Sequence, residues 1–333
     1  MAGSISIDRG DRTVKKNKWL LILGIGLSAA WLSSCGKALD RPYQWDQRTS
    51  VFKNGYEDGR AQGFAADLCV LSPEDTWEDE RVNAEAAAVF DLSGKQVIFG
   101  KNAFEQLYPA SITKVMTAII AIKYGNLSDQ VTMTDEAVIT EAGASLCNVH
   151  PGDTLTLEQL LYGLMLPSGN DAAAAIAVHM AGSIEDFAQM MNDEAMRIGA
   201  TGTHFVNPHG LTDPDHYTTA YDLYLMFNEA LKLPLFREII SSTAYTAEYT
   251  DGQGNPVSQT WKGGNWYMTG ERETPDGLTV LGGKTGTTSA AGYCLIMAVE
   301  DQAESEYISV VLKAGSRAGL YDNMTEIIQK ISN

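Results

Sequence analysis

Apolar residues gather in short runs, broken by turn residues, toward both ends of the chain. Residues 86–99 contain two such runs around a turn at Leu92–Lys95, which predicts a β-hairpin. An alternating run at residues 244–250 predicts another strand. Three more strands and a closing helix are predicted further on, at residues 279–287, 291–300, 307–313 and 325–331.

Helical periodicity dominates the middle of the chain. The predicted helices cover residues 111–124, 155–166, 171–181, 184–198 and 217–230. The first of them is apolar on most faces and should be buried, and it lies between Pro109 and Gly125, which are typical of helix ends. Strands at both ends with helices between them predict an α/β (α+β) fold. In it, the two ends of the chain close one antiparallel sheet around a helical insertion.

Residues 1–34 have the pattern of an export signal. Lysines precede an uncharged apolar run, Trp19–Leu32, which is shorter than the roughly 20 residues that a membrane span needs. Leu32-Ser33-Ser34-Cys35 resembles a bacterial lipobox, so Cys35 is the expected lipid attachment site. A plain signal peptide and an uncleaved anchor are the alternatives.

The stretch that follows is polar and lacks apolar periodicity, which is typical of a tether. We therefore expect a signal peptide at residues 1–34, a tether at residues 35–65 and one folded domain at residues 66–333. Such a protein would be extracytoplasmic and anchored to the outer face of the cell membrane as a lipoprotein.

Charge and cysteine content narrow the function classes. The 333 residues carry a formal net charge of −18, which argues against nucleic-acid binding because proteins of that class present basic surfaces. After Cys35 the remaining cysteines are Cys69, Cys147 and Cys294, and no two of them are close in sequence. Buried free thiols are the expected state, and a bridge such as Cys69–Cys147 is the alternative.

Three short motifs carry the candidate chemistry. They are Ser111-Ile112-Thr113-Lys114, Ser168-Gly169-Asn170 and Lys284-Thr285-Gly286-Thr287. Together they supply a hydroxyl nucleophile, a lysine that can act as its base, a second polar pair and a cation on a strand edge. Acyl transfer through a serine ester needs these groups.

Each motif also has a simpler explanation when it is taken alone. A spacing of three at the start of a helix puts Ser111 and Lys114 on one face, but Lys114 could instead extend its amine to the surface. Ser168 and Asn170 could merely cap a helix. Lys284 could be an exposed edge lysine that discourages aggregation. The occurrence of all three motifs in this order favours the enzyme.

The motifs and their surroundings, Tyr108–Thr117 and Thr203–Leu211, resemble the low-molecular-weight penicillin-binding proteins of the D-alanyl-D-alanine carboxypeptidase family, peptidase family S11. The resemblance covers residues 66–333. It implies the serine β-lactamase/penicillin-binding-protein-like fold, an antiparallel five-stranded sheet flanked by helices with an all-helical insertion. It also implies a serine-type carboxypeptidase of cell-wall synthesis, which removes the terminal D-Ala from peptidoglycan stem pentapeptides through an acyl-enzyme.

The resemblance implies a catalytic role for the first two motifs. Ser111 would attack the peptide carbonyl between two D-alanines, and Lys114 would take its proton. Lys114 must then be neutral, and its burial and the nearby Lys284 cation would both lower its pKa. Ser168 and Asn170 would relay protons and orient the substrate. The Ser111 hydroxyl is therefore expected within hydrogen-bonding reach of both amines.

The third motif would bind the substrate. Lys284 and Thr285 would hold its terminal carboxylate, and Gly286 and Thr287 would complete the binding segment. The backbone amides of Ser111 and Thr287 would form an oxyanion hole, an effect typically worth ~3 kcal/mol per donor.

The expected partners are the stem peptide, β-lactam antibiotics as covalent inhibitors, and the membrane through the amino-terminal anchor. No cofactor, metal or nucleic acid is expected. The family often has an arginine just ahead of the last helix that helps to hold the carboxylate, and Arg317 is a displaced candidate for it. The motifs leave open the balance between carboxypeptidase, endopeptidase and transpeptidase activity.

Three other functions are alternatives. A class A β-lactamase would share the fold, but the sequence has no Glu-x-x-Leu-Asn box. A zinc peptidase would need ligands from one histidine-rich segment, where the spacing matches no familiar zinc site. Its candidates are His204, His209, His216, Asp213 and Asp215. A non-catalytic sensor that binds penicillin would carry the same motif residues as the enzyme.

Overall fold

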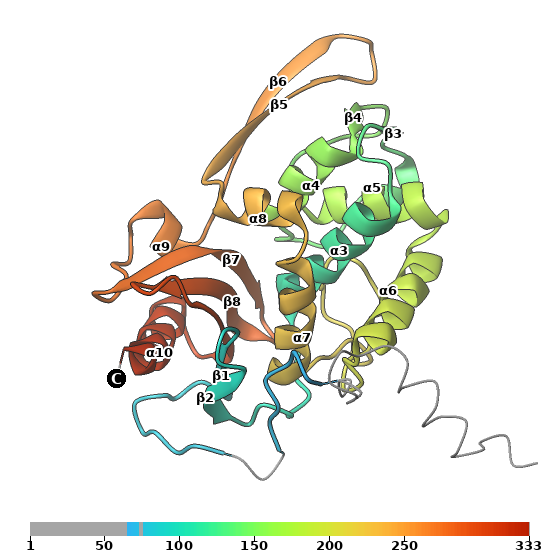
Figure 1. Cartoon of the computed structure of the whole chain (residues 1–333). Helices are drawn as coiled ribbons and strands as arrows, with labels where there is room; N and C mark the ends of the chain where they lie inside the picture. Colours follow the sequence, from blue (N-terminus) through green and yellow to red (C-terminus); the bar gives the residue numbers. More distant parts are fainter. Residues whose placement is uncertain (1–64, 73–75, 333) are drawn as a thin grey trace, which may run out of the picture. The chain divides into compact units, whose positions relative to one another are not determined.

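The computed structural model describes residues 65–72 and 76–332 (Figure 1). The expected signal peptide at residues 1–34, the lipid attachment site at Cys35 and the tether up to residue 64 lie outside the described residues. Asp67–Asn333 group into one compact unit. Within the described part of the chain, no helix is both long enough and apolar enough to cross a membrane.

The two ends of the described chain meet in one antiparallel sheet, as the sequence predicts. Its five strands have the order β2-β1-β9-β8-β7. Their bounds are β1 Ala86–Asp91, β2 Gln96–Lys101, β7 Leu278–Thr288, β8 Gly292–Asp301 and β9 Glu306–Ala314. The amino-terminal hairpin β1–β2 therefore joins the carboxyl-terminal meander through the pairing of β1 with β9.

Helix α10, Arg317–Ile328, packs on one face of this sheet over β9 and β8 (Figure 1). The sequence places the last helix at residues 325–331, and this prediction is wrong at its start. The side chain of Ser316 accepts a hydrogen bond from the Gly319 amide, so the helix begins directly after β9. The first turn of this helix contains a glycine and shows little apolar periodicity, so the sequence pattern does not predict where the helix begins.

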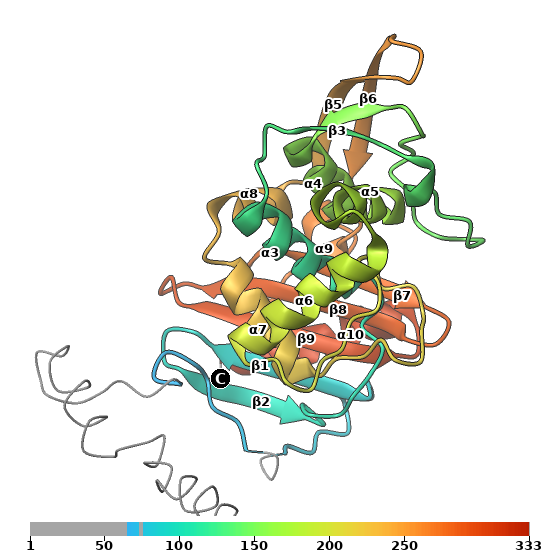
Figure 2. The same cartoon turned by 90° about the vertical axis from the view of Figure 1, so that its right-hand side faces the viewer.

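The other face of the sheet carries the helices of the insertion (Figure 2). Their bounds are η1 Ala110–Thr113, α3 Lys114–Tyr124, α4 Leu157–Met165, α5 Asn170–Ala181, α6 Ile184–Ile198, α7 Ala220–Ala230 and α8 Pro234–Ser241. Helix α3 contacts each of α4 to α8, which agrees with its apolar sequence. The helix predicted at residues 217–230 begins at Ala220, where Thr219 caps it. Helix α8 was not predicted.

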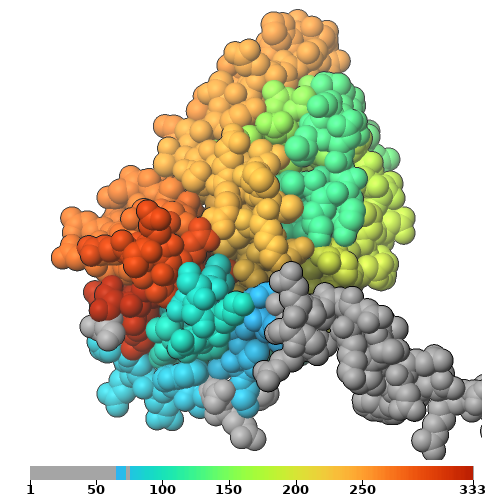
Figure 3. All heavy atoms as spheres, in the orientation of Figure 1, coloured from blue at the N-terminus to red at the C-terminus, as the bar shows by residue number. Residues whose placement is uncertain are grey.

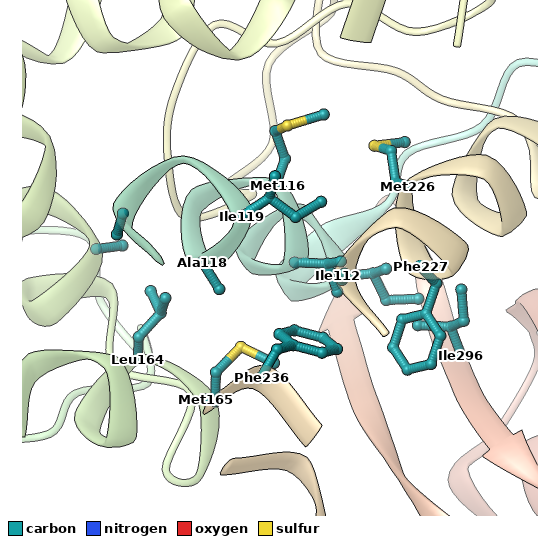
Figure 4. Packing of buried hydrophobic residues seen from close by; sticks show 14 of the residues in the cluster. Ile112, Met116, Ala118, Ile119, Leu164, Met165, Met226, Phe227, Phe236 and Ile296 are labelled. Atoms are coloured by element: carbon teal, nitrogen blue, oxygen red, sulfur yellow. The ribbon is translucent and has the colours of Figure 1, made fainter. Parts of the chain in front are cut away.

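Close packing fixes helix α3 and the turn before it. Ile112, Met116 and Ile119 lie against side chains from the neighbouring helices and from strand β8 (Figure 4). Those side chains are Leu164, Met165, Phe227, Phe236 and Ile296. Closely packed protein interiors tolerate little displacement of their side chains. The polar groups at the start of α3 are therefore held rigidly.

The insertion is not all-helical, and on this point the sequence-based expectation is wrong. The described chain contains a second sheet, of order β3-β4-β5-β6. Its strands are β3 Gln130–Thr132, β4 Thr154–Thr156, β5 Ala244–Thr250 and β6 Pro256–Lys262. The first two are too short for a periodic signal. The hairpin β5–β6 projects from the body of the molecule (Figure 3).

Candidate active site

Ser111 and Lys114 face each other at the start of the buried helix. Ser111 lies in the 3-10 turn η1, and Lys114 is the first residue of α3. Residues three apart are nearly eclipsed in a 3-10 turn, and the Lys114 Nζ atom lies 3.1 Å from the Ser111 Oγ atom. Lys114 is fully buried, so the alternative in which it extends to the surface is wrong.

The surroundings of Lys114 fit a neutral amine. In addition to its contact with the serine, the Nζ atom donates hydrogen bonds to the Asn170 Oδ1 atom at 2.6 Å and to the His209 carbonyl at 2.8 Å. A neutral amine has two N–H groups and one lone pair, so these two acceptors leave the lone pair for the Ser111 hydroxyl proton. Burial, and after it the charge of Lys284, lowers the pKa of Lys114 well below its ordinary value.

The second motif lies in the short link between α4 and α5. Ser168 has a φ of 63°, a conformation that non-glycine residues rarely adopt and that often marks a functional site. Asn170 opens α5, but its Oδ1 atom accepts from Lys114, and the N-cap position, Gly169, makes no side-chain bond. The explanation of this motif as mere helix caps is therefore wrong for Asn170.

Lys284 lies on the edge strand β7 and is 2% exposed. Its Nζ atom donates to the Ser168 hydroxyl at 2.9 Å and to the Thr285 carbonyl at 2.7 Å. Among the described hydrogen bonds it has none to Ser111, so the expectation that both amines reach that hydroxyl holds only for Lys114. Because Lys284 is buried, the alternative in which it is an exposed edge lysine that discourages aggregation is also wrong. Burial lowers the pKa of Lys284 to about 7.

A cavity of about 490 Å³ opens beside Ser111. Asn170, Thr287 and the loop Glu141–Ser145 also line it. Sequence analysis could not predict this loop as part of the site, because the loop has neither a motif nor a periodic pattern. Glu141 is the one residue of the cavity lining, within the described chain, that has a carboxylate.

Strand β7 fits closely against the nucleophile turn. A Cβ atom on Gly286 would lie 2.9 Å from the Pro109 carbonyl oxygen and 3.0 Å from the Ser111 nitrogen. Only glycine allows this approach. Thr287 faces the large cavity, whereas Lys284 and Thr285 line a neighbouring hollow of about 30 Å³. The third motif thus borders the serine on one side and Ser168 on the other.

The histidines of the proposed zinc site are held by hydrogen bonds within the protein. His209 and His216 are buried, and burial lowers their pKa values to about 3 and about 4. The Nδ1 atom of His204 lies 2.5 Å from the Asp215 carbonyl oxygen. Across residues 65–72 and 76–332, no group of three or more His, Cys, Asp or Glu side chains could hold a metal ion.

The remaining candidates lie away from the serine. Cys69, Cys147 and Cys294 are buried free thiols, as expected, and the alternative of a bridge between Cys69 and Cys147 is wrong. The Arg317 guanidinium lies 5.8 Å from the centre of the Trp266 ring, which stacks in turn on Tyr321. The displaced arginine thus lies over Trp266, in the segment that follows β6.

The chain is similar in sequence to known proteins. The sequence profile of the D-alanyl-D-alanine carboxypeptidase family, peptidase S11, matches residues 73–316. The carboxypeptidase DacF of Bacillus subtilis (strain 168) is 33% identical over 70% of this chain and 58% of its own length. DacC of Escherichia coli (strain K12) is 34% identical over 80% of this chain and 65% of its own. The chain thus spans about 58% to 65% of the length of these relatives.

Solved structures share the fold. The Streptomyces K15 DD-transpeptidase has a TM-score of 0.70 and 29% identity, covering 76% of this chain and 98% of its own. A D-alanyl-D-alanine carboxypeptidase from Mycobacterium tuberculosis H37Rv has a TM-score of 0.67 and 27% identity, covering 79% of this chain and 96% of its own. The penicillin-binding-protein-like fold that the motifs imply is confirmed. The chain therefore belongs to the D-alanyl-D-alanine carboxypeptidase family, peptidase family S11.

Proposed function

We propose that the protein is a serine-type D-alanyl-D-alanine carboxypeptidase. It removes the terminal D-Ala from peptidoglycan stem pentapeptides through an acyl-enzyme, and β-lactam antibiotics acylate it covalently. One observation carries the proposal: the Lys114 Nζ atom lies 3.1 Å from the Ser111 Oγ atom while its two other hydrogen-bonding directions are occupied. This arrangement suits an amine whose lone pair takes the serine proton.

In the acylation step, the Ser111 Oγ atom attacks the carbonyl carbon of the penultimate D-Ala, and its proton passes to Lys114. The peptide C–N bond then breaks, and the proton moves on to the amine of the departing D-Ala. Ser168 is bonded to Lys284, and Asn170, two residues further on, is bonded to Lys114. The link between α4 and α5 thus contacts both lysines, which suits a relay of that proton by Ser168. Asn170 keeps Lys114 directed at the serine.

Lys284 is suited to hold the terminal carboxylate of the substrate. As an ammonium group it has three N–H donors, and the described contacts occupy two of them, at Ser168 and Thr285. The third is available to the substrate, and a bound carboxylate would favour the charged form of Lys284. Thr285, Gly286 and Thr287 extend this binding segment along strand β7.

The oxyanion of the tetrahedral intermediate needs donors beside the serine. The backbone amides of Ser111 and Thr287 are the proposed pair, since both residues line the large cavity and Gly286 lets their segments approach. In the deacylation step, water attacks the ester carbonyl and gives its proton to Lys114, which returns it to the Ser111 oxygen. The free enzyme is thereby restored.

The same proposal extends to the parts of the chain outside the described residues. Residues 1–34 act as a signal peptide, Cys35 carries the lipid, and residues 35–65 tether the catalytic domain at residues 66–333. The supporting pattern is the lysine-flanked apolar run that ends at the lipobox-like Leu32–Cys35. The enzyme would then work on the outer face of the cell membrane.

The test combines peptide mass spectrometry with fluorescent penicillin labelling. The wild-type protein should remove one D-Ala from a purified stem pentapeptide and take up the label, and Ser111→Ala should do neither. Ser128→Ala, at an exposed turn beyond the far end of α3, is the matched control and should behave as wild type. Persistent labelling of Ser111→Ala would refute the assignment. Adding an amino acceptor measures the share of transpeptidation, the activity named for the Streptomyces K15 relative.

A further inference from the structure

His216 is buried behind the nucleophile turn, where the proposed reaction makes no use of it. The residue is 1% exposed and belongs to the loop between α6 and α7. Its Nε2 atom lies 2.8 Å from the Thr113 Oγ1 atom, and its Nδ1 atom accepts from the Val206 amide at 3.2 Å. The Thr113 hydroxyl in turn donates to the Ala110 carbonyl at 2.8 Å. A chain of bonds thus connects His216 to the residue before Ser111.

The positions of the protons in this chain of hydrogen bonds can be assigned. The hydroxyl of Thr113 has one proton, and the Ala110 carbonyl can only accept, so that proton points to Ala110. The Nε2 atom of His216 must then be the donor to Thr113. Its Nδ1 atom accepts from an amide and carries no proton. His216 is therefore the neutral imidazole protonated on Nε2, which agrees with the lowering of its pKa to about 4 by burial.

The Ala110 carbonyl, which this chain of hydrogen bonds holds, belongs to the same peptide group as the Ser111 N–H, the proposed oxyanion donor. The Ala110 C=O and the Ser111 N–H are the two ends of one planar trans peptide and point in opposite directions. Fixing the oxygen therefore fixes the direction of the N–H. Ser111 lies in the first turn of a helical segment, where amides have no acceptor within the helix and are free for a ligand.

This peptide needs an external restraint. Ala110 has a φ of 48°, in a region that costs a non-glycine residue energy and persists only where surrounding contacts enforce it. A Cβ atom on Gly210 would lie 1.9 Å from the Ala110 oxygen, so the backbone closes on that side as well. The hydroxyl of Thr113 is the directional contact that sets the angle of the peptide.

We propose that His216 and Thr113 form a positioning pair, which orients the Ala110–Ser111 peptide so that the Ser111 N–H faces the oxygen of the acyl intermediate. The inference rests on the proposed function, because it assigns that N–H to the oxyanion hole. His216 touches neither substrate nor reacting atoms and acts only through Thr113. A residue that merely filled space here would need no donor at Nε2.

The test separates the hydrogen bonds from the packing. Thr113→Val removes the hydroxyl at nearly constant shape, and Thr113→Ser retains it. His216→Phe removes the donor and keeps a ring. We expect Thr113→Val and His216→Phe to lower kcat and the rate of penicillin acylation about tenfold or more with little change in KM, since an oriented donor acts mainly in the transition state. Thr113→Ser should stay within a few-fold of wild type.

The double variant Thr113→Val/His216→Phe should be no slower than Thr113→Val alone, because both changes break one chain of bonds. Ile327→Val, in the core between α10 and the sheet, is the control for general destabilisation. It should retain wild-type kcat well below its own unfolding temperature. Wild-type rates in folded Thr113→Val, or multiplicative losses in the double variant, would overturn the inference.

Failure of the proposed function gives a different result. In that case the wild-type protein would release no D-Ala from the pentapeptide. The rate of penicillin acylation depends on the same Ser111 N–H, so it would still measure the effect of changing Thr113 or His216. If the wild-type protein reacted with neither compound, both the function and the inference would be refuted.

Discussion

The ammonium nitrogen of Lys284 lies 2.9 Å from the hydroxyl oxygen of Ser168, which precedes it by 116 residues. This bond joins edge strand β7 of the main sheet to the link between α4 and α5 in the insertion. It places a cation beside the serine–lysine pair without a direct bond to Ser111. Lys284 thus has two effects: its charge lowers the pKa of Lys114, and the same charge is available to the substrate.

Replacing Lys284 by Met should separate activity from stability. A charge-assisted hydrogen bond to the substrate carboxylate is worth roughly 1.5–3 kcal/mol, so kcat/KM for the pentapeptide should fall about 10- to 100-fold. Thermal stability should stay equal or rise, because a buried cation without a carboxylate partner is costly. Steady-state kinetics and thermal unfolding measure both. Lys262→Met, exposed on β6, is the control, and unchanged kinetics of Lys284→Met would contradict the assignment.

Replacing Lys114 by Arg should abolish acylation, because it puts a permanent cation in place of a neutral amine. A guanidinium stays protonated in proteins and therefore offers no lone pair to the Ser111 proton. Loss of a general base typically costs 10²–10⁴-fold in rate, which fluorescent penicillin labelling under single-turnover conditions can resolve. Lys123→Arg, on the same helix, can preserve its ion pairs with Glu194 and Glu229 and should label at the wild-type rate. Equal labelling of both variants would count against the role of Lys114 as base.

Acid should destabilise the fold through His209 and His216. Burial lowers their pKa values from 6.5 to about 3 and about 4, so between these values and 6.5 only the unfolded chain binds the protons. The free energy of unfolding then falls with falling pH, by up to about 1.4 kcal/mol per pH unit for each histidine. Urea unfolding from pH 7 to pH 4.5 measures this slope, and His216→Phe should reduce it. An unchanged slope in that variant would contradict the pKa assignment.

Replacing Gly286 by Ala should impair acylation more than stability. The new Cβ atom would lie 2.9 Å from the Pro109 oxygen and 3.0 Å from the Ser111 nitrogen, so β7 must move away from the nucleophile turn. Displacements of about 1 Å in such sites can cost 10²-fold in rate. Gly315→Ala, whose Cβ atom would meet nothing within 4 Å, is the control. Penicillin acylation rates compare the two, and similar rates would argue against a close fit at Gly286.

The sequence predicts the part of the site that depends on local spacing. Ser111 and Lys114 are three residues apart on one segment, and the run at residues 279–287 predicts the strand that carries Lys284. The contacts that complete the site join distant segments, and one of them uses a backbone carbonyl, that of His209, which any residue could supply. A contact made by a backbone carbonyl cannot be predicted from the pattern of side chains in the sequence.

The errors in the predicted fold have related causes. Strands β3 and β4 are three residues each, too short for a period of two to show, and they form because the chain brings them together. Helix α10 is defined at its start by the Ser316 cap rather than by an apolar stripe. The same limit applies to His216, whose partner Thr113 lies 103 residues away.

The strand order of the main sheet has a consequence for the biogenesis of the protein. Strand β9 lies between β1 and β8, so the hairpin made first during synthesis has no partner on that side until Glu306–Ala314 has left the ribosome. Until then the early hairpin cannot join the strand that carries Lys284 in one sheet. The serine–lysine pair, which is synthesised early, can therefore gain its complete sheet only after Glu306–Ala314 has been added.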